Sequence, residues 1–365
     1  MFMIIRSKSQ LKKYEKFDLK NFKHPFCFRE KKKKYKLYEM PKFRSNFFKA
    51  KPVIEELKEK VLFISGPARS GNHLLISMLD NHPQIASEIG EDDFLRTIFS
   101  YANVNEKKLI KDLKNFKSGI LLNSSGQPKL GKGKGKNKWK ALYEIYKNGI
   151  KSNVWSGNQP EGSPHITDFQ EIVPKINYES FREHFKTNEK KISNVRNFLQ
   201  IFNIYLQGKK KLIYDYKKNE KNYIYKNRWS GSGLRRELFY LLERSNKIIC
   251  LTPIRRFENF YYSYAKTRHS TTGIEQKALD DMWEHWRHKV IDYLLLKKKY
   301  PNKIIIIKFE DIINQPKKVA KKLLKKLGLK FDKSVLSTSL LGVKSLGNSS
   351  YKKNKKIEGK YYKSS

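Results

Sequence analysis

The sequence predicts an α/β protein with three layers and a mostly parallel central sheet. Short apolar runs that are typical of buried parallel strands occupy residues 61–65, 246–254 and 303–309. Helical patterns follow these runs, so strands and helices alternate along the chain. A turn from Gly66 to Gly71 joins the first run to its helix and adds a P-loop-like motif to this fold.

The first strand and helix give the clearest pattern. "VLFIS" ends at Gly66, and Pro83 marks the end of the helix that follows, because proline disfavours helical backbone in the residue before it. Four apolar residues share one face of that helix: Leu74, Leu75, Met78 and Leu79.

Three further helices are predicted. One runs through "ENFYYSYAK", residues 258–266, and a longer one covers about 279–300. An amphipathic helix over 316–327 is closed by Gly328. The longer helix carries a stripe at helical spacing, interpreted as core: Met282, Trp283, Trp286, Val290, Tyr293 and Leu294.

The domain boundaries follow changes in composition. Residues 1–60 are dense in Lys and aromatic residues, and we interpret them as a basic extension that is partly disordered or lies on the surface. Residues 61–345 form the predicted domain, and residues 346–365 a basic C-terminal loop or tail. Residues 100–240 show little pattern and include "KLGKGKGKNKWK", which is typical of a mobile basic loop.

The charge is extreme. The chain has 79 Lys and Arg against 35 Asp and Glu, which leaves a net charge of +44. Such an excess indicates polyanionic ligands or partners. The richness in Lys, Asn, Ile, Tyr and Phe also fits AT-biased coding without any acidic partner, and the composition leaves both explanations open.

The cysteines and the apolar runs indicate the cellular compartment of the protein. Two cysteines, Cys27 and Cys250, cannot form a disulfide framework, which favours a reducing compartment. "MFMII" is too short for a secretory leader, and no run approaches the roughly 18 apolar residues of a membrane span. We therefore expect a soluble, cytoplasmic protein.

The loop departs from the triphosphatase signature. Its glycines have the right spacing, but Asn72 and His73 stand where that signature has Lys and Ser or Thr. A helix N-terminus still binds phosphate through its free N–H groups, and Arg69 and Ser70 add donors. The expected ligand is a terminal phosphate group of a nucleotide, bound without an obligatory metal.

A second anion site is predicted beside the loop. Arg255 directly follows the second strand, and Ser263 comes eight residues later. Ligands of open α/β sheets bind at the carboxyl ends of the strands. Arg255 and Ser263 are therefore expected to converge on a second phosphate.

These motifs resemble the sulfotransferases that use 3′-phosphoadenosine-5′-phosphosulfate (PAPS). The resemblance rests on "SGPARSGNHLLISMLDNHP", the Arg255–Ser263 spacing and "IIIIKFEDIINQPKKVAKKLLKKLGL". It implies a sulfuryl-transfer enzyme in which Arg255 and Ser263 hold the 3′-phosphate. The residues implied for the 5′-phosphosulfate are those of the loop: Pro67, Ala68, Arg69, Ser70, Gly71, Asn72 and His73.

The loop also departs from the family pattern, and the C-terminal match is weaker. Asn72 and His73 replace two hydroxyl residues, although an amide and an imidazole can still donate hydrogen bonds to phosphate. Residues 345–359 resemble, less clearly, the segment that closes over the nucleotide.

The resemblance also suggests catalytic residues. Arg69 is expected to stabilise charge on the departing phosphate oxygen. Glu91, preceded by Gly90 as in such relatives, is the preferred general base, with Glu88 second. These carboxylates have an alternative role in capping the next helix. His82 is interpreted as a helix-ending residue.

The sequence features are consistent with three functions. The leading hypothesis is a PAPS-dependent sulfotransferase acting on a hydroxyl or amine, with an anionic acceptor such as a polysaccharide favoured by the Gly-Lys loop. The second is a polyanion- or nucleic-acid-binding protein on an inactive P-loop scaffold. The third, a degenerate kinase, is disfavoured by the missing lysine.

Glu310 and Asp311, which follow an apolar run, are interpreted as structural residues. No group of Cys and His residues has the spacing of a zinc site.

Overall fold

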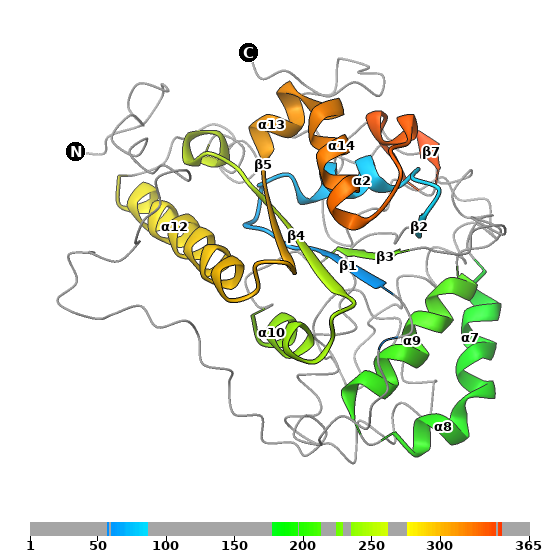
Figure 1. Cartoon of the computed structure of the whole chain (residues 1–365). Helices are drawn as coiled ribbons and strands as arrows, with labels where there is room; N and C mark the ends of the chain where they lie inside the picture. Colours follow the sequence, from blue (N-terminus) through cyan, green and yellow to red (C-terminus); the bar gives the residue numbers. More distant parts are fainter. Residues whose placement is uncertain are drawn as a thin grey trace, which may run out of the picture.

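The computed structural model (Figure 1) describes residues 57, 60–86, 177–195, 197–212, 224–228, 235–261, 276–340 and 342–344. Its centre is a parallel sheet in the order β2 (Ile85–Ala86), β3 (Ile224–Arg228), β1 (Lys60–Ile64), β4 (Ile248–Ile254) and β5 (Ile304–Lys308). The predicted fold class is confirmed.

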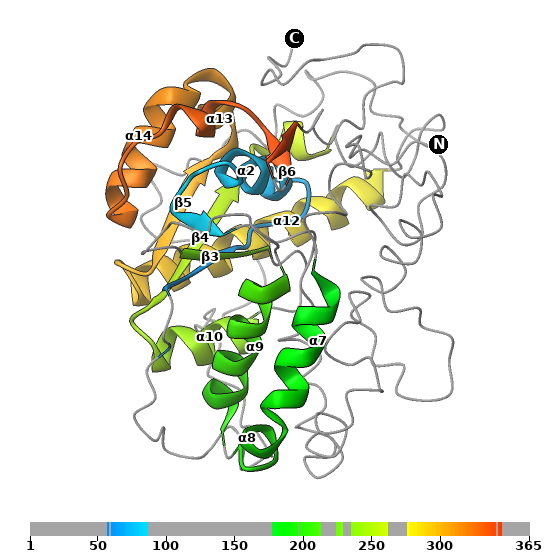
Figure 2. The same ribbon diagram turned by 90° about the vertical axis from the view of Figure 1, so that its right-hand side faces the viewer.

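Helices cover both faces of the sheet (Figures 1 and 2). One face carries α2 (Asn72–Leu79), α13 (Phe309–Asn314) and α14 (Pro316–Leu327), and the other carries α9 (Phe198–Leu212), α10 (Arg235–Arg244) and α12 (Gln276–Lys299). Outside α9 lie α7 (Tyr178–Thr187) and α8 (Glu189–Ser193). After α14 come the 3₁₀ turn η5 (Lys333–Leu336) and a hairpin of β6 (Ser339–Leu340) and β7 (Val343–Lys344).

Alternate residues of β1 pack into the two helical layers. Leu62 and Ile64 belong to the core formed with α2, α13 and α14. Phe63 points the other way, and its ring centroid lies 6.5 Å from that of Phe202 on α9. Side chains on both faces of the strand are therefore buried, which explains why it is apolar from Val61 to Ile64.

The predicted strands and helices agree with the described structure to within a few residues, and of the helix predicted over 258–266 only the part up to Tyr261 lies within the described residues. Cys250, in β4, is fully buried, and burial raises the pKa of its thiol to about 12. The stripe on α12 is core at Trp286, Val290 and Tyr293, while Trp283 is half-buried against Phe257. These positions support the interpretation of the stripe as core.

The amphipathic helix is also confirmed. It forms α14, and Gly328 ends it with a φ of 71°, a left-handed conformation that favours glycine. By contrast, the sequence did not predict β3 or the helices α7 to α10. β3 falls within residues 100–240, yet it lies inside the sheet between β1 and β2.

A buried carboxylate connects α2 to the C-terminal hairpin. Asp80 follows the last residue of α2 and is fully buried. Its Oδ2 accepts hydrogen bonds from Ser339 Oγ at 2.7 Å and Gly342 N at 2.9 Å. The end of α2 is thus joined to β6 and to the turn that follows it.

Acid should destabilise the fold through His184. Burial is the main cause that lowers the pKa of this α7 side chain from its usual 6.5, and Lys211 and Lys191 add to the effect. Because the pKa is lower in the folded state, His184 takes up a proton on unfolding, and stability falls as the pH drops below 6.5.

The measurement is the urea midpoint at pH 7.5 and pH 5.5 for the wild type and for His184→Gln. Glutamine does not titrate, and its amide can still donate to Ile204 O, which lies 2.9 Å from His184 Nε2. The variant should lose less stability on acidification. An equal loss in both proteins would exclude His184 as a source of the pH dependence.

Candidate functional site

The candidate site lies at the carboxyl ends of three neighbouring strands. The loop Ser65–Gly71 follows β1, Arg255 follows β4, and Phe309 follows β5. Because β1, β4 and β5 are adjacent and parallel, these segments meet at one edge of the sheet. The loop and Arg255 therefore lie close together, as the sequence predicted.

Two glycines allow the loop to fit against its neighbours. A side chain at Gly66 would collide with the carbonyl oxygen of Pro253 in β4. A side chain at Gly71 would collide with the ring of Phe309, and Gly71 also has a φ of 93°. The loop therefore packs directly on β4 and α13, and both glycines are needed for this approach.

Arg69 has an uncommon backbone conformation. Its φ of 59° makes it the one non-glycine residue with a positive φ in the part of the chain that the structure describes. Left-handed backbone at such a residue costs on the order of 1–3 kcal/mol and is concentrated at ligand-binding sites. The half-buried Arg69 lies at the tip of the loop, beside the exposed Ala68.

Asn72 holds the loop in shape from the inside. It is 4% exposed, and its Nδ2 donates to the carbonyl oxygens of Gly66 and Pro67, both at 3.2 Å. These contacts fix the orientation of the amide, because the reverse orientation would place its Oδ1 against the carbonyl oxygens of Gly66 and Pro67. Both amide hydrogens thus face loop carbonyls, at the position where the triphosphatase signature has its phosphate-binding lysine.

The hydroxyl of Ser70 is a buried donor at the start of α2. Ser70 is fully buried, and within the described residues its Oγ makes no hydrogen bond. Buried hydroxyl groups are normally satisfied by protein, water or a ligand. Together with the N–H groups at the N-terminus of α2, Ser70 makes this turn suitable for an anion.

Arg255 brings a second cation to the loop. Its Nη1 lies 3.4 Å from the carbonyl oxygen of Arg69, and its guanidinium lies over the Phe309 ring, 4.3 Å from the centroid. The backbone of Arg255 is fixed as well, because Trp286 Nε1 donates to its carbonyl oxygen at 3.2 Å. The guanidinium is thus held between the loop and α13.

Two ionisable side chains considered in the sequence, Glu310 and His82, have structural roles. Glu310 Oε1 accepts from the backbone N–H of Arg256 at 3.1 Å and from Asn259 Nδ2 at 3.0 Å, at the start of the helix beginning at Phe257. His82 is 1% exposed, and its ring nitrogens contact Lys330 O and Gln84 N. Both observations support the structural interpretations from the sequence.

Several predicted site residues cannot be placed. Ser263, Glu88, Glu91 and residues 345–359 lie outside the described residues, as does the side chain of His73. Pro67 is buried in the loop. Phe309 and Pro253, which shape the loop, were not predicted, because nothing in their local sequence indicates that two other strands bring them against glycines of the first.

The fold and site define a class: an α/β protein with a P-loop-like turn that lacks the triphosphatase lysine. The chain belongs to the sulfotransferase domain family, whose family model matches residues 59–364. A search of curated proteins returned no match.

Solved sulfotransferase structures are similar at low identity. The sulfotransferase domain of the Synechococcus PCC 7002 olefin synthase has 15% identity and a TM-score of 0.44, covering 79% of each chain. The domain from the curacin biosynthetic pathway has 13% identity and a TM-score of 0.38, covering 76% of this chain and 77% of that one. A Mycobacterium avium sulfotransferase has 10% identity and a TM-score of 0.32, covering 76% and 66%.

No described helix is both long and apolar enough to cross a membrane. In the same described ranges, no group of three or more His, Cys, Asp or Glu side chains is arranged to hold a metal ion.

Proposed function

We propose that this protein transfers a sulfuryl group from PAPS to a hydroxyl or amine of an acceptor. The observation that supports this best is the position of Arg255, whose guanidinium lies beside a phosphate-type loop that has no lysine. A ligand with two separated phosphate groups matches such a pair of sites. A nucleoside triphosphate instead has its phosphates in one chain and calls for the lysine that Asn72 replaces.

The loop and Arg255 carry the kinds of group that bind PAPS. The N–H groups at the start of α2 and the buried Ser70 hydroxyl would bind the 5′-phosphosulfate, with His73 as a further contact. Arg255, with Ser263, would bind the 3′-phosphate, because a guanidinium can make two hydrogen bonds to one phosphate. Asn72 would act indirectly, by holding the carbonyls of Gly66 and Pro67 away from the anion.

In the proposed reaction, the acceptor oxygen or nitrogen forms a bond to sulfur as the bond from sulfur to the phosphate oxygen breaks. Arg69 would stabilise the negative charge on that phosphate oxygen. Glu91, or Glu88, would take the proton from the acceptor. The products are the sulfated acceptor and 3′,5′-diphosphoadenosine, and positioning and electrostatics supply most of the rate enhancement.

For the acceptor, we propose an anionic polysaccharide. The Gly-Lys run at residues 129–140 supports an acceptor that already carries negative charge. We propose a cytoplasmic location, which is supported by the scarcity of cysteines and by the buried, free thiol of Cys250.

The donor site is tested by isothermal titration of the full chain with 3′,5′-diphosphoadenosine and with AMP, in EDTA. We expect saturable binding of the diphosphate that is at least about 100-fold tighter than that of AMP, since two further charge-assisted hydrogen bonds contribute about 3 kcal/mol. Equal, weak binding of both, falling steeply with salt, would overturn the proposal. It would favour the alternative of a polyanion-binding protein on an inactive scaffold.

A further inference from the structure

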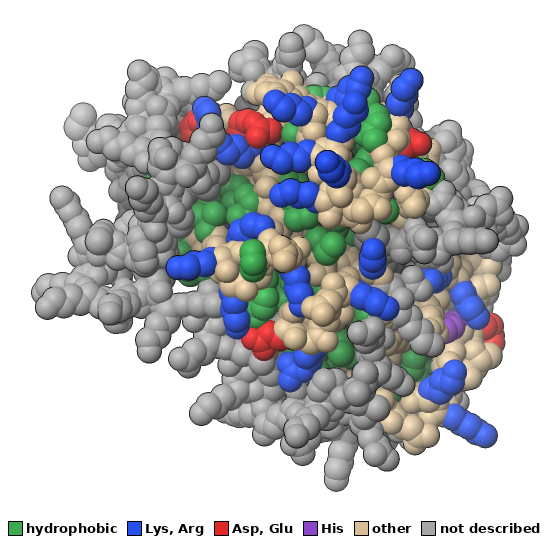
Figure 3. Space-filling view, viewed as in Figure 1, with side chains coloured by type: hydrophobic (Ala, Val, Ile, Leu, Met, Phe, Trp, Pro, Cys, Tyr) green, Lys and Arg blue, Asp and Glu red, His purple; other side chains and the backbone are tan. Residues whose placement is uncertain are grey.

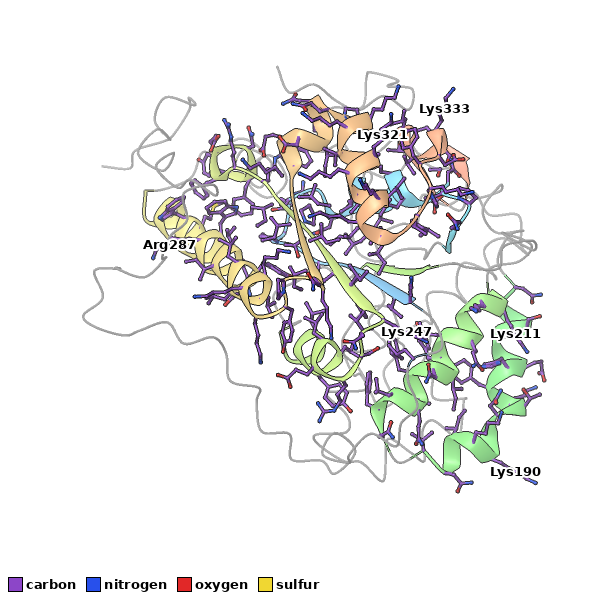
Figure 4. All side chains as sticks on the ribbon, viewed as in Figure 1. Lys190, Lys211, Lys247, Arg287, Lys321 and Lys333 are labelled. Carbon is purple, nitrogen blue, oxygen red and sulfur yellow. The ribbon has the colours of Figure 1, made fainter. Side chains whose placement is uncertain are left out.

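The outer face of α14 is formed entirely by lysine. Figure 3 shows Lys and Arg side chains gathered over this helix, and Figure 4 labels Lys321 on α14 and Lys333 in the η5 turn beside it. We call six exposed residues of α14 the lysine face: Lys317, Lys318, Lys321, Lys322, Lys325 and Lys326.

The lysine face takes up one half of the helix surface. At about 100° per residue, its six side chains span about 180° of the helix circumference. The other half is used by the core: Ala320, Leu323, Leu324 and Leu327 are buried against the sheet and α2. Since the helix needs no further apolar cover, its cationic half is available for a partner.

The positive charges of the lysine face are not balanced. α14 contains no acidic residue, and four pairs of lysines lie four residues apart, an arrangement that destabilises a helix by about 0.2–0.5 kcal/mol per pair. The ion pairs between described residues include Lys186–Glu183, Arg256–Glu258 and Lys299–Glu243, and none of these three involves α14. An anionic partner would remove this repulsion.

Further lysines lie beyond α14, together with one carboxylate, that of Asp332. Lys330 and Lys333 are exposed just after the helix. At the end of α12, burial and then repulsion from Lys326 lower the pKa of Lys297. The lysine face is thus the centre of a larger positive surface.

The residues around the lysine face limit the kinds of partner that can bind to it. The apolar side of α14 is buried, so the helix cannot insert into a lipid surface. The lysine face has no arginine, and the neighbouring Phe331 is covered by Lys321, whose Nζ lies 5.5 Å from the ring centroid. It therefore lacks the aromatic platforms on which single-stranded nucleic acids stack.

The lysine face also begins near the candidate site. Phe309, the first residue of α13, packs against Gly71 and Arg255. Only Gln315 separates the end of α13 from the start of α14. A long polymer with one unit at the site would have α14 beside it, with room for about 18 Å of contact along the helix.

We propose that the lysine face of α14 is a docking surface for an acidic polysaccharide, outside the site of sulfuryl transfer. This choice of polymer rests on the proposed function, because an acceptor must offer free hydroxyl or amine groups. An acidic polysaccharide has hydroxyl groups on every unit, whereas duplex DNA has free hydroxyl groups only at its ends.

The test uses the full chain and fluorescein-labelled heparin, with binding followed by fluorescence anisotropy from low to high salt. The variant replaces Lys318, Lys321, Lys322 and Lys325 by Gln, which keeps helix propensity and removes like-charge repulsion. A matched control replaces Lys190, Lys191, Lys210 and Lys211 by Gln, which removes the same charge from α8 and α9 on another part of the molecule (Figure 4).

We expect the α14 variant to bind heparin at least tenfold more weakly and with a smaller salt dependence, and the control to change less than twofold. Equal weakening of both variants would overturn the proposal, because it would show that total charge determines binding. Stronger competition by duplex DNA than by unlabelled heparin at equal charge would also overturn it. Titration with 3′,5′-diphosphoadenosine separates this outcome from failure of the proposed function, since both variants should bind it like the wild type.

Discussion

Arg255→Ala should weaken binding of 3′,5′-diphosphoadenosine by roughly 100-fold and leave AMP binding almost unchanged. The guanidinium lies at the loop, and in the proposed function it makes charge-assisted hydrogen bonds to the 3′-phosphate, which AMP lacks. Loss of such bonds costs about 3 kcal/mol, or about two orders of magnitude in the dissociation constant. Isothermal titration with the two nucleotides measures both effects.

Arg256→Ala is the matched control. It removes the same charge one residue later, but its side chain is 73% exposed and lies 3.9 Å from Glu258. It should bind both nucleotides nearly as the wild type does. If both variants weakened the two nucleotides equally, Arg255 would contribute only general positive charge, and the 3′-phosphate site would be wrong.

Asn72→Asp should have the second large effect. A carboxylate of the same shape would lose both hydrogen bonds and place negative charge against the carbonyl oxygens of Gly66 and Pro67. We expect a loss of about 2–4 kcal/mol in the free energy of unfolding, because the site is buried. Denaturant unfolding measures this loss, and titration should show a further loss of nucleotide affinity in the folded variant.

Two variants separate the role of Asn72 from a general effect of added charge. Asn302→Asp makes the same change at an exposed position before β5 and should alter stability by less than about 0.5 kcal/mol. Asn72→Ser retains one donor and should lose less nucleotide affinity than Asn72→Asp. Full nucleotide affinity in folded Asn72→Asp would show that the loop does not depend on this side chain.

The sheet was predictable where both faces of a strand are buried. "VLFI" and "IIII" are apolar throughout because each strand lies between two helical layers, and the same holds for Cys250 and its neighbours. β3 reads "IYKNR", which has no such run, although it pairs with both β1 and β2. Its place in the sheet depends on backbone hydrogen bonds that local hydrophobicity does not indicate.

The site was predictable in outline. The approach of Arg255 to the loop follows from strand order and from the rule that ligands bind at the carboxyl ends of strands. The direction of the Asn72 amide could not be predicted, because it depends on where the carbonyls of Gly66 and Pro67 point. The roles of Glu88, Glu91 and Ser263 stay predictions.

The adjacency of β1 and β4 has a consequence for selectivity. The two strands are hydrogen-bonded neighbours about 4.8 Å apart, and β4 continues for three residues beyond Leu251, the partner of Ile64, before Arg255 follows it. A hydrogen-bonded sheet cannot stretch to suit a ligand. The fixed spacing of the central strands would therefore select nucleotides by the distance between their two phosphate groups.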